Sequence, residues 1–222
     1  MATHTGRADV GAPMDVDWRV YLVTQQSLSR GRSTPDVVRA AIEGGVDAVQ
    51  LREKHLPARD RYEMGRTVRD LTATAGVPLV VNDRVDLAAA LDADGVHLGD
   101  EDLPVPVARE LLGDDAVVGR SVATVEGARE AAAAGADYLG VGDVFGTTSK
   151  DTDAASTAIG LDRLRAVADA VDVPVVAIGG VTAENAGDAV GAGATGVAVI
   201  SAVTAADDPE AATRALVAAT RD

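Results

Sequence analysis

The sequence predicts an α/β protein in which eight parallel strands close into one (β/α)8 barrel, the TIM barrel. Short apolar runs rich in valine recur at a spacing of roughly 20–30 residues, and an alanine-rich segment with helical spacing follows each of them. Polar side chains gather where these runs end, which is where such a barrel places its active site. An open doubly wound sheet is less favoured, because no GxGxxG motif follows the first apolar run.

Helix-start signals separate the apolar runs in the first half of the chain. Thr34 is the predicted N-cap of the first helix, and Pro35 suits its first position. The second and fourth helices follow Pro57 and Pro104, and the third runs through residues 87–91. The four strands are predicted at residues 19–24, 47–51, 78–81 and 95–98.

The same alternation continues in the second half. Thr124 and Thr182 are the predicted N-caps of the helices that follow strands five and seven, and Asp208 begins the last helix. A long loop over residues 142–159 precedes the sixth helix. The four strands are predicted at residues 116–121, 137–141, 174–178 and 196–200.

We expect a single domain over residues 18–222, with a disordered extension over residues 1–17. The extension carries Gly, Pro and scattered charge without a hydrophobic segment, so it does not resemble a secretory signal. No apolar run approaches the ~18 residues of a membrane span. The prediction is therefore a cytoplasmic protein with no membrane partner.

The charge of the chain restricts its partners. A net charge of −15 argues against a nucleic-acid partner, which would require a basic face. The absence of cysteine excludes a disulfide framework and thiolate chemistry. Of the 20 basic residues, 18 are arginine, and the two lysines are Lys54 and Lys150. High acidity with so little lysine is typical of proteins from a high-salt cytoplasm, although genomic base composition can also favour it.

The second apolar run ends in a dense group of polar side chains. Gln50, Leu51, Arg52, Glu53 and Lys54 place an amide, a guanidinium, a carboxylate and an ammonium beside one another. At the carboxyl end of a barrel strand such groups indicate catalysis or binding. The alternative is a strand that continues into a solvated loop.

Two aspartates at neighbouring strand ends suggest a metal site. Asp83 follows the third strand and Asp102 lies shortly after the fourth. Two carboxylates together with a substrate phosphate are a common way to hold Mg²⁺. The alternative is that both aspartates cap the helices that follow them. His97 lies in the fourth strand, where we favour a structural role over an acid–base role.

Glycines and hydroxyl groups near the last strands suggest phosphate binding. Gly179-Gly180 follows strand seven and Ser201 follows strand eight, which is the usual position of the phosphate site in this fold. Thr147, Thr148 and Ser149 add hydroxyl donors beside Lys150. A plain tight turn at the two glycines is the alternative. Together the residues predict a barrel enzyme that binds a diphosphate with Mg²⁺ and a separate monophosphate.

Taken in order, these motifs resemble those of the thiamine phosphate synthase family over about residues 18–220. The matching segments are Gln50–Lys54, Val81–Asp83, Gly95–Gly99 with Glu101–Asp102, Thr147–Lys150, Ile178–Gly180 and Ile200–Ser201. The resemblance implies a (β/α)8 barrel that joins hydroxymethylpyrimidine diphosphate to a carboxythiazole phosphate, giving thiamine phosphate, diphosphate and CO₂. Its partners would be these two small molecules, and a homo-oligomer is compatible with the family.

The resemblance also assigns residues to the two substrates. The pyrimidine diphosphate would be bound by Gln50, Leu51, Arg52, Glu53, Lys54, Asn82, Ser121 and Lys150. The thiazole phosphate would be bound by Thr147, Thr148, Ser149, Gly180, Ile200 and Ser201. Asp83 and Asp102 would hold Mg²⁺, while Arg52, Lys54, Ser121 and Lys150 would be the catalytic residues.

Three positions depart from the family pattern. Asp100 stands where glutamine is usual, and Asp143 and Gly146 stand where prolines are common in the loop after strand six. Two other functions stay open. One is a thiazole tautomerase of the same superfamily, which would need no diphosphate site. The other is a regulatory barrel that binds phosphate without turnover.

Overall fold

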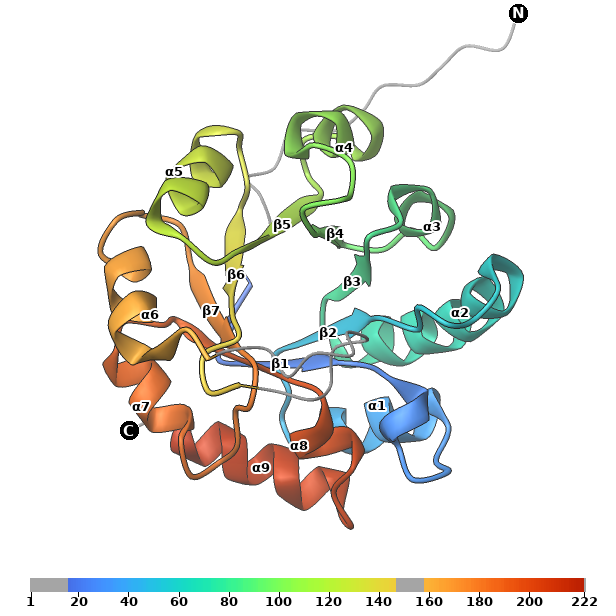
Figure 1. Ribbon diagram of the computed structural model, residues 1–222. Helices are drawn as coiled ribbons and strands as arrows, with labels where there is room; N and C mark the ends of the chain where they lie inside the picture. Colours follow the sequence, from blue (N-terminus) through green and yellow to red (C-terminus); the bar gives the residue numbers. More distant parts are fainter. Residues whose placement is uncertain (1–15, 147–157, 222) are drawn as a thin grey trace, which may run out of the picture.

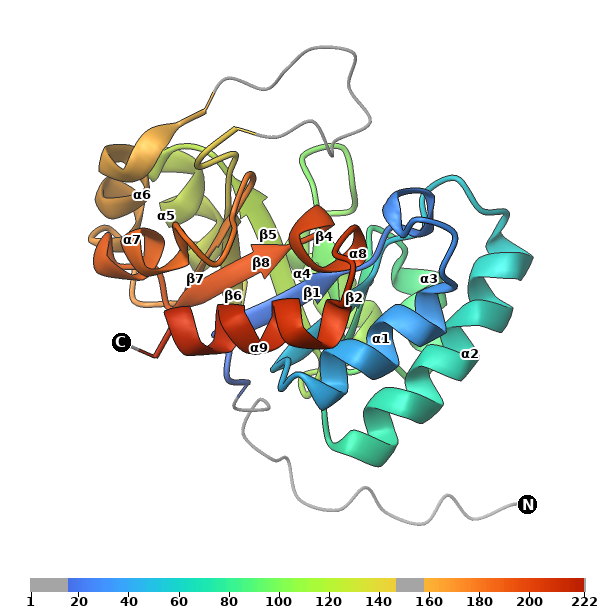
Figure 2. The same cartoon turned by 90° about the horizontal axis from the view of Figure 1, so that it is seen from below.

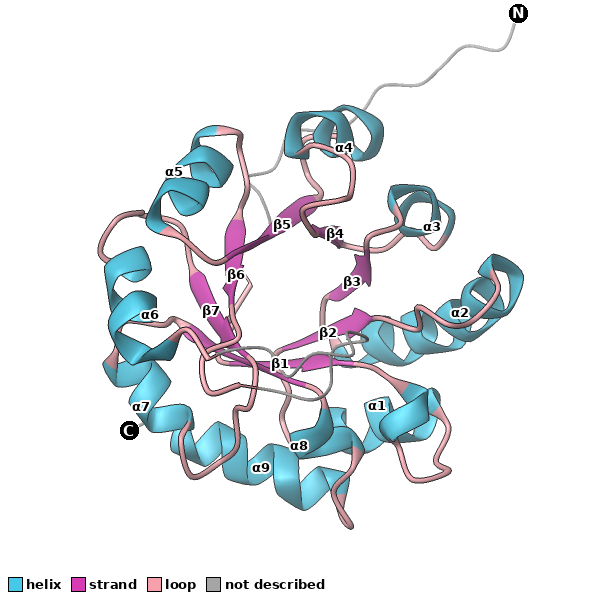
Figure 3. Ribbon diagram, viewed as in Figure 1, coloured by secondary structure: helices cyan, strands magenta, loops and turns pink. Residues whose placement is uncertain are grey.

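The protein folds as a closed barrel of eight parallel strands, shown end-on in Figures 1 and 3. The computed structural model describes residues 16–146 and 158–221. Each strand pairs with the next in sequence, and β8 pairs with β1 to close the barrel. The strands are β1 (Val20–Val23), β2 (Ala48–Leu51), β3 (Leu79–Asn82), β4 (Gly95–Leu98), β5 (Val117–Val122), β6 (Tyr138–Val141), β7 (Val175–Ile178) and β8 (Gly196–Val199). The predicted fold and all eight predicted strands are confirmed.

The helices form an outer ring around the strands. They are α1 (Thr34–Glu43), α2 (Ala58–Ala75), α3 (Val85–Ala90), α4 (Val105–Leu112), α5 (Val125–Ala133), α6 (Gly160–Ala168), α7 (Ala186–Gly191), α8 (Ser201–Thr204) and α9 (Pro209–Ala219). Helices α9, α1 and α2 lie side by side outside the barrel (Figure 2). None of the helices within the described ranges is long and apolar enough to cross a membrane.

The structure adds two short helices that the sequence pattern did not predict. A 3-10 helix, η1 (Gln26–Leu28), follows β1, and the four-residue α8 follows β8 directly. Ser201 is therefore the first residue of α8, and Ile200, which was predicted to end the eighth strand, is the N-cap of this helix. Elements this short leave no clear periodic signal in a sequence.

Two of the predicted helix caps are confirmed and two are wrong. Thr124 caps α5 and Asp208 caps α9 through their side-chain oxygens. The N-cap of α1 is Ser33 instead of Thr34, since the Ser33 hydroxyl accepts from the Asp36 N–H. For α7, Thr182 lies one turn too early, and the helix begins after Asn185.

Apolar residues form two packed regions, one on each side of the barrel wall. The larger lies between the strands and the helices and consists mostly of Val, Leu and Ala. The smaller fills the barrel interior and contains Trp18, Tyr21 and Tyr138. Trp18 stacks on Tyr138 with ring centroids 3.9 Å apart. Three of the five aromatic residues in the chain thus lie inside the barrel.

Candidate active site

A cavity of about 590 Å³ opens at the carboxyl ends of the strands. Its wall is predominantly polar on the side of β2 to β5 and more apolar on the side of β7 and β8. The lining includes Gln50, Arg52, Lys54, Asn82, Asp83, His97, Asp100, Asp102, Ser121, Tyr138, Ile178 and Ile200. The mouth of the barrel therefore holds eight of the twelve described residues that the strand-end pattern and the family resemblance predicted.

The structure brings most of the described candidate residues together and leaves four outside the lining. Those in the cavity wall are Gln50, Arg52, Lys54, Asn82, Asp83, Asp102, Ser121 and Ile200. Leu51, Glu53, Gly180 and Ser201 are not among the lining residues. Thr147, Thr148, Ser149 and Lys150 lie outside the described residues.

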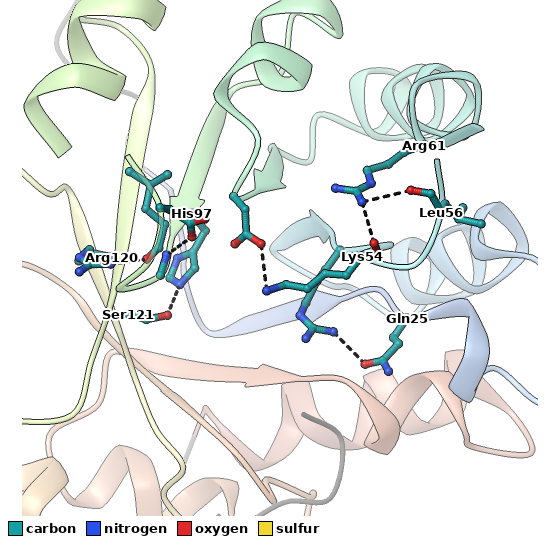
Figure 4. Close-up of polar contacts among 12 residues, drawn as sticks. Gln25, Lys54, Leu56, Arg61, His97, Arg120 and Ser121 are labelled. Carbon is teal, nitrogen blue, oxygen red and sulfur yellow. Dashed lines mark hydrogen bonds and ion pairs between the residues drawn. The ribbon is translucent and has the colours of Figure 1, made fainter. Parts of the chain in front are cut away.

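Lys54 and Asp83 form an ion pair across the ends of β2 and β3. The Lys54 Nζ lies 2.9 Å from the Asp83 Oδ2, and Figure 4 shows the Lys54 side chain in this position. Asp83 has a φ of 64°, in the left-handed region that few side chains adopt without a structural reason. Its N–H donates to the carbonyl of His97 at 2.8 Å, which holds this bend against β4.

Asp102 supplies a second carboxylate beside Asp83. Its Oδ2 accepts from the Gly99 N–H at 2.5 Å. Burial raises the pKa of Asp102, and the neighbouring Asp83 carboxyl raises it further. Two adjacent carboxylates repel one another, so a cation between them is favoured.

The donor set fits magnesium. Asp83 and Asp102 offer hard carboxylate oxygens at a cavity wide enough for a phosphate and water molecules, and Mg²⁺ is usually held by one or two carboxylates plus such groups. Within residues 16–146 and 158–221, no three His, Cys, Asp or Glu side chains form a complete metal cage.

Glu53 turns away from the cavity and stabilises the loops behind it. Its carboxylate accepts from the Gln26 N–H at 2.9 Å and from the Thr34 hydroxyl at 2.7 Å. The residue is 5% exposed. This places Glu53 between η1 and the first turn of α1, where it fixes the positions of both. Leu51, its neighbour on the same side of the chain, is fully buried among the core residues.

Arg52 and Arg61 were not expected to interact with the loop framework, yet both do. The Arg52 Nη1 donates to the Gln25 Oε1 at 3.0 Å. The buried Arg61 of α2 donates from Nη2 to the carbonyls of Lys54 at 3.0 Å and Leu56 at 3.3 Å (Figure 4). Arg61 thereby fixes the turn that presents Lys54. Nothing in the local sequence identified Arg61, because its role depends on how α2 packs.

His97 faces into the barrel. Its Nδ1 lies 2.9 Å from the Tyr138 hydroxyl. Its Nε2 lies 2.9 Å from the Ser121 hydroxyl, as Figure 4 shows. Burial lowers the pKa of His97 from 6.5 to about 4, so the ring is neutral at neutral pH. Beside it, Asn82 is buried and its Nδ2 has no hydrogen-bond partner among the described residues. That amide is positioned to bind a ligand acceptor.

The three residues that depart from the family pattern, Asp100, Asp143 and Gly146, have different surroundings in the structure. Asp100 pairs with Arg120 at 2.8 Å on the rim of the cavity, so its added charge has a cation beside it. Asp143 is buried at the end of β6. Gly146 has a φ of 80°. A Cβ added to Gly180 would lie 2.2 Å from the carbonyl oxygen of Gly146. Glycine at position 180 therefore allows the two loops to approach.

Comparisons with known proteins identify the family. The model of the thiamine monophosphate synthase family matches residues 20–203. The chain belongs to this family. The thiamine-phosphate synthase of Natronomonas pharaonis is 68% identical over 203 residues, which cover 91% of this chain and 95% of that protein. That of Haloarcula marismortui is 66% identical over 202 residues, covering 90% and 96%.

A solved structure agrees with both fold and family. The thiamine phosphate pyrophosphorylase from Pyrococcus furiosus is 43% identical, with a TM-score of 0.83, over 92% of this chain and 96% of that chain. The two curated relatives above come from halophiles, in line with the composition of this sequence.

Proposed function

We propose that this enzyme joins hydroxymethylpyrimidine diphosphate to a carboxythiazole phosphate, giving thiamine phosphate, diphosphate and CO₂. The observation that carries the proposal is the meeting of Lys54, Asp83 and Asp102 at one mouth in a member of the thiamine monophosphate synthase family. A cation beside two carboxylates is suited to a diphosphate that arrives with Mg²⁺.

The diphosphate end of the first substrate belongs near β2 to β4. Lys54 and Arg52 line this part of the cavity and would bind the diphosphate oxygens, together with Lys150 from the loop outside the described residues. Asp83 and Asp102 would hold Mg²⁺, which when bound neutralises charge on the departing diphosphate. Lys54 would leave Asp83 and turn toward the diphosphate.

The pyrimidine ring belongs deeper in the barrel. Gln50, Asn82 and Ser121 face the same cavity. The Asn82 Nδ2, which has no hydrogen-bond partner in the described part of the chain, would supply a donor there. Below them, the aromatic residues and Val176 close the barrel interior. This floor would exclude water from the reactive methylene group of the substrate.

The thiazole phosphate belongs near β7 and β8. Gly179 and Gly180 have φ values of 99° and 67°, and these conformations turn the backbone after β7 against Phe145 and Gly146. Gly180, Ile200 and Ser201 would form one side of this subsite, and Thr147, Thr148 and Ser149 would form the other. Ile178 and Ile200 line the cavity between the two subsites.

The reaction needs positioning more than it needs a protein nucleophile. The methylene C–O bond breaks, and its electron pair leaves with the diphosphate. The amino group of the pyrimidine stabilises the methylene cation, and the thiazole nitrogen lone pair then forms the new C–N bond. The C–C bond to the carboxylate then breaks, CO₂ leaves, and the electron pair of that bond stays on the thiazole part, which takes up one proton from water. Holding both substrates in one cavity can supply much of the acceleration.

Diphosphate release tests this proposal directly. Purified protein in high salt with Mg²⁺ should release diphosphate only when both substrates are present. Rearrangement of the thiazole phosphate alone would identify a tautomerase, and binding without turnover would identify a regulatory barrel. A cytoplasmic location and a homo-oligomer remain part of the proposal, and sedimentation velocity would test the latter.

A further inference from the structure

A chain of hydrogen bonds crosses the barrel interior from β2 to β5. The Gln50 Nε2 donates to the Tyr21 hydroxyl at 2.9 Å, and this hydroxyl lies 2.9 Å from that of Tyr138. The Tyr138 hydroxyl contacts the His97 Nδ1, and the His97 Nε2 contacts the Ser121 hydroxyl, each at 2.9 Å. Both ends of the chain, Gln50 and Ser121, line the cavity.

The interior is shaped to hold this chain. A Cβ on Gly119 would lie 2.2 Å from the Tyr138 ring, and one on Gly140 would lie 3.0 Å from the His97 ring. The missing side chains thus make room for both rings. Burial raises the pKa of Tyr21 and of Tyr138, so each hydroxyl keeps its proton at neutral pH and has one hydrogen to donate.

We propose that this chain runs in one direction, from Gln50 to Ser121, and fixes the Ser121 hydroxyl as a donor toward the cavity. The Gln50 amide N–H can only donate, so Tyr21 accepts it and donates to Tyr138. Tyr138 then donates to the His97 Nδ1. A neutral ring that accepts at Nδ1 carries its proton on Nε2, and that N–H donates to the Ser121 oxygen.

The direction of the hydrogen-bond chain determines which donor and acceptor groups a ligand must present to Gln50 and Ser121. The Ser121 hydroxyl hydrogen is left for a ligand acceptor, while the Gln50 Oε1 is left to accept from a ligand N–H. A flat heterocycle with a ring nitrogen near β5 and an amino group near β2 satisfies both. This step rests on the proposed function, since an aminopyrimidine has both groups. Tyr21, Tyr138 and His97 are positioning residues that act through Ser121.

The tautomer of His97 gives a direct test that needs no substrate. Protein labelled with ¹⁵N is measured at neutral pH by long-range ¹H–¹⁵N correlation, and His97→Gln assigns the signal among the three histidines. The expected form carries its proton on Nε2. A proton on Nδ1 would reverse the direction of the chain and overturn the proposal.

Three tyrosine variants separate the chain from general packing. Tyr21→Phe removes a hydroxyl that is two hydrogen bonds from His97, and Tyr138→Phe removes its direct partner. Both should produce a mixture of His97 tautomers. The matched control is Tyr62→Phe on α2, outside the chain, which should leave the wild-type tautomer. An unchanged single His97 tautomer in both Tyr21→Phe and Tyr138→Phe would refute the proposal. If a variant fails to fold, the wild-type spectrum still decides the direction of the hydrogen-bond chain.

Kinetics then test the ligand requirement. Tyr21→Phe and Tyr138→Phe each remove a hydroxyl that orients the Ser121 hydrogen bond to the ligand. Each variant should therefore raise KM for the pyrimidine diphosphate about fivefold, which is the size expected for one neutral hydrogen bond. KM for the thiazole phosphate should stay within twofold. Equal changes in both KM values would refute a role in pyrimidine binding. Failure of the wild type to form thiamine phosphate would reject the proposed function alone, leaving the tautomer result standing.

Discussion

The Lys54 ammonium lies 2.9 Å from the Asp83 carboxylate and joins the ends of β2 and β3. The two side chains are 41% and 22% exposed, and such partly exposed pairs contribute little stability. Separating them therefore costs little free energy. On the proposed function, the pair would keep a diphosphate-binding cation and a metal-binding carboxylate together until a ligand with Mg²⁺ replaced the contact.

Replacing Lys54 with arginine tests whether geometry matters as well as charge. Arginine is a wide planar fork and does not substitute for a compact ammonium at a tight phosphate site. We expect Lys54→Arg to lower kcat/KM about tenfold, near 1.4 kcal/mol of transition-state stabilisation. Steady-state kinetics measure it, and Arg66→Lys on the exposed face of α2 is the control. Full activity of Lys54→Arg would remove Lys54 from the proposed catalytic residues. We expect Lys150→Arg to lower kcat/KM by a similar factor.

Removing one carboxylate charge tests the magnesium site. Asp83→Asn and Asp102→Asn should each reduce turnover at least about tenfold at a fixed Mg²⁺ concentration, since each loses a charged metal ligand. Titration with Mg²⁺ should show a higher half-saturating concentration. Asp86→Asn is the control, because Asp86 is exposed and pairs with Arg84. Unchanged Mg²⁺ dependence in both site variants would place the ion elsewhere.

Glu53→Gln tests the stabilising role of the buried carboxylate. Glu53 accepts from the Gln26 N–H and from the Thr34 hydroxyl, so neutralising it should cost about 1–3 kcal/mol of stability. Urea unfolding measures the loss, with exposed Glu63→Gln as control. Unchanged stability combined with lost activity would instead support the substrate-binding role predicted from the sequence.

The neutral state of His97 predicts a stability dependence on pH. Burial lowers its pKa from 6.5 to about 4, so between these values the unfolded chain binds more protons than the folded one. Stability should therefore fall as the pH drops through this window, by up to about 1.4 kcal/mol per pH unit from this residue. Urea unfolding at several pH values should show a shallower slope for His97→Gln. Equal slopes would contradict a neutral His97.

The barrel and its mouth could be predicted because apolar runs and polar strand ends leave strong local signals. The direction of each side chain was also readable, through the two-residue alternation of strands. Gln50 and Arg52 face the cavity, whereas Leu51 and Glu53 face the helices. The same alternation places His97 inside the barrel. Reading Gln50–Lys54 as one continuous binding segment overlooked this alternation.

Other features depend on tertiary contacts that a sequence pattern does not contain. Thr34 could be expected to cap α1, but Ser33 does so, while the Thr34 hydroxyl contacts Glu53 from the neighbouring loop. Arg61 holds the Lys54 turn only because α2 packs against β2. These positions follow from how separate segments meet.

Product identification tests the central claim most directly. The protein should be incubated with Mg²⁺, the thiazole phosphate and pyrimidine diphosphate carrying ¹³C at its methylene group, and the mixture analysed by mass spectrometry. The proposed function predicts labelled thiamine phosphate together with equal amounts of diphosphate and CO₂. Unchanged labelled substrate, with or without rearranged thiazole phosphate, would contradict it.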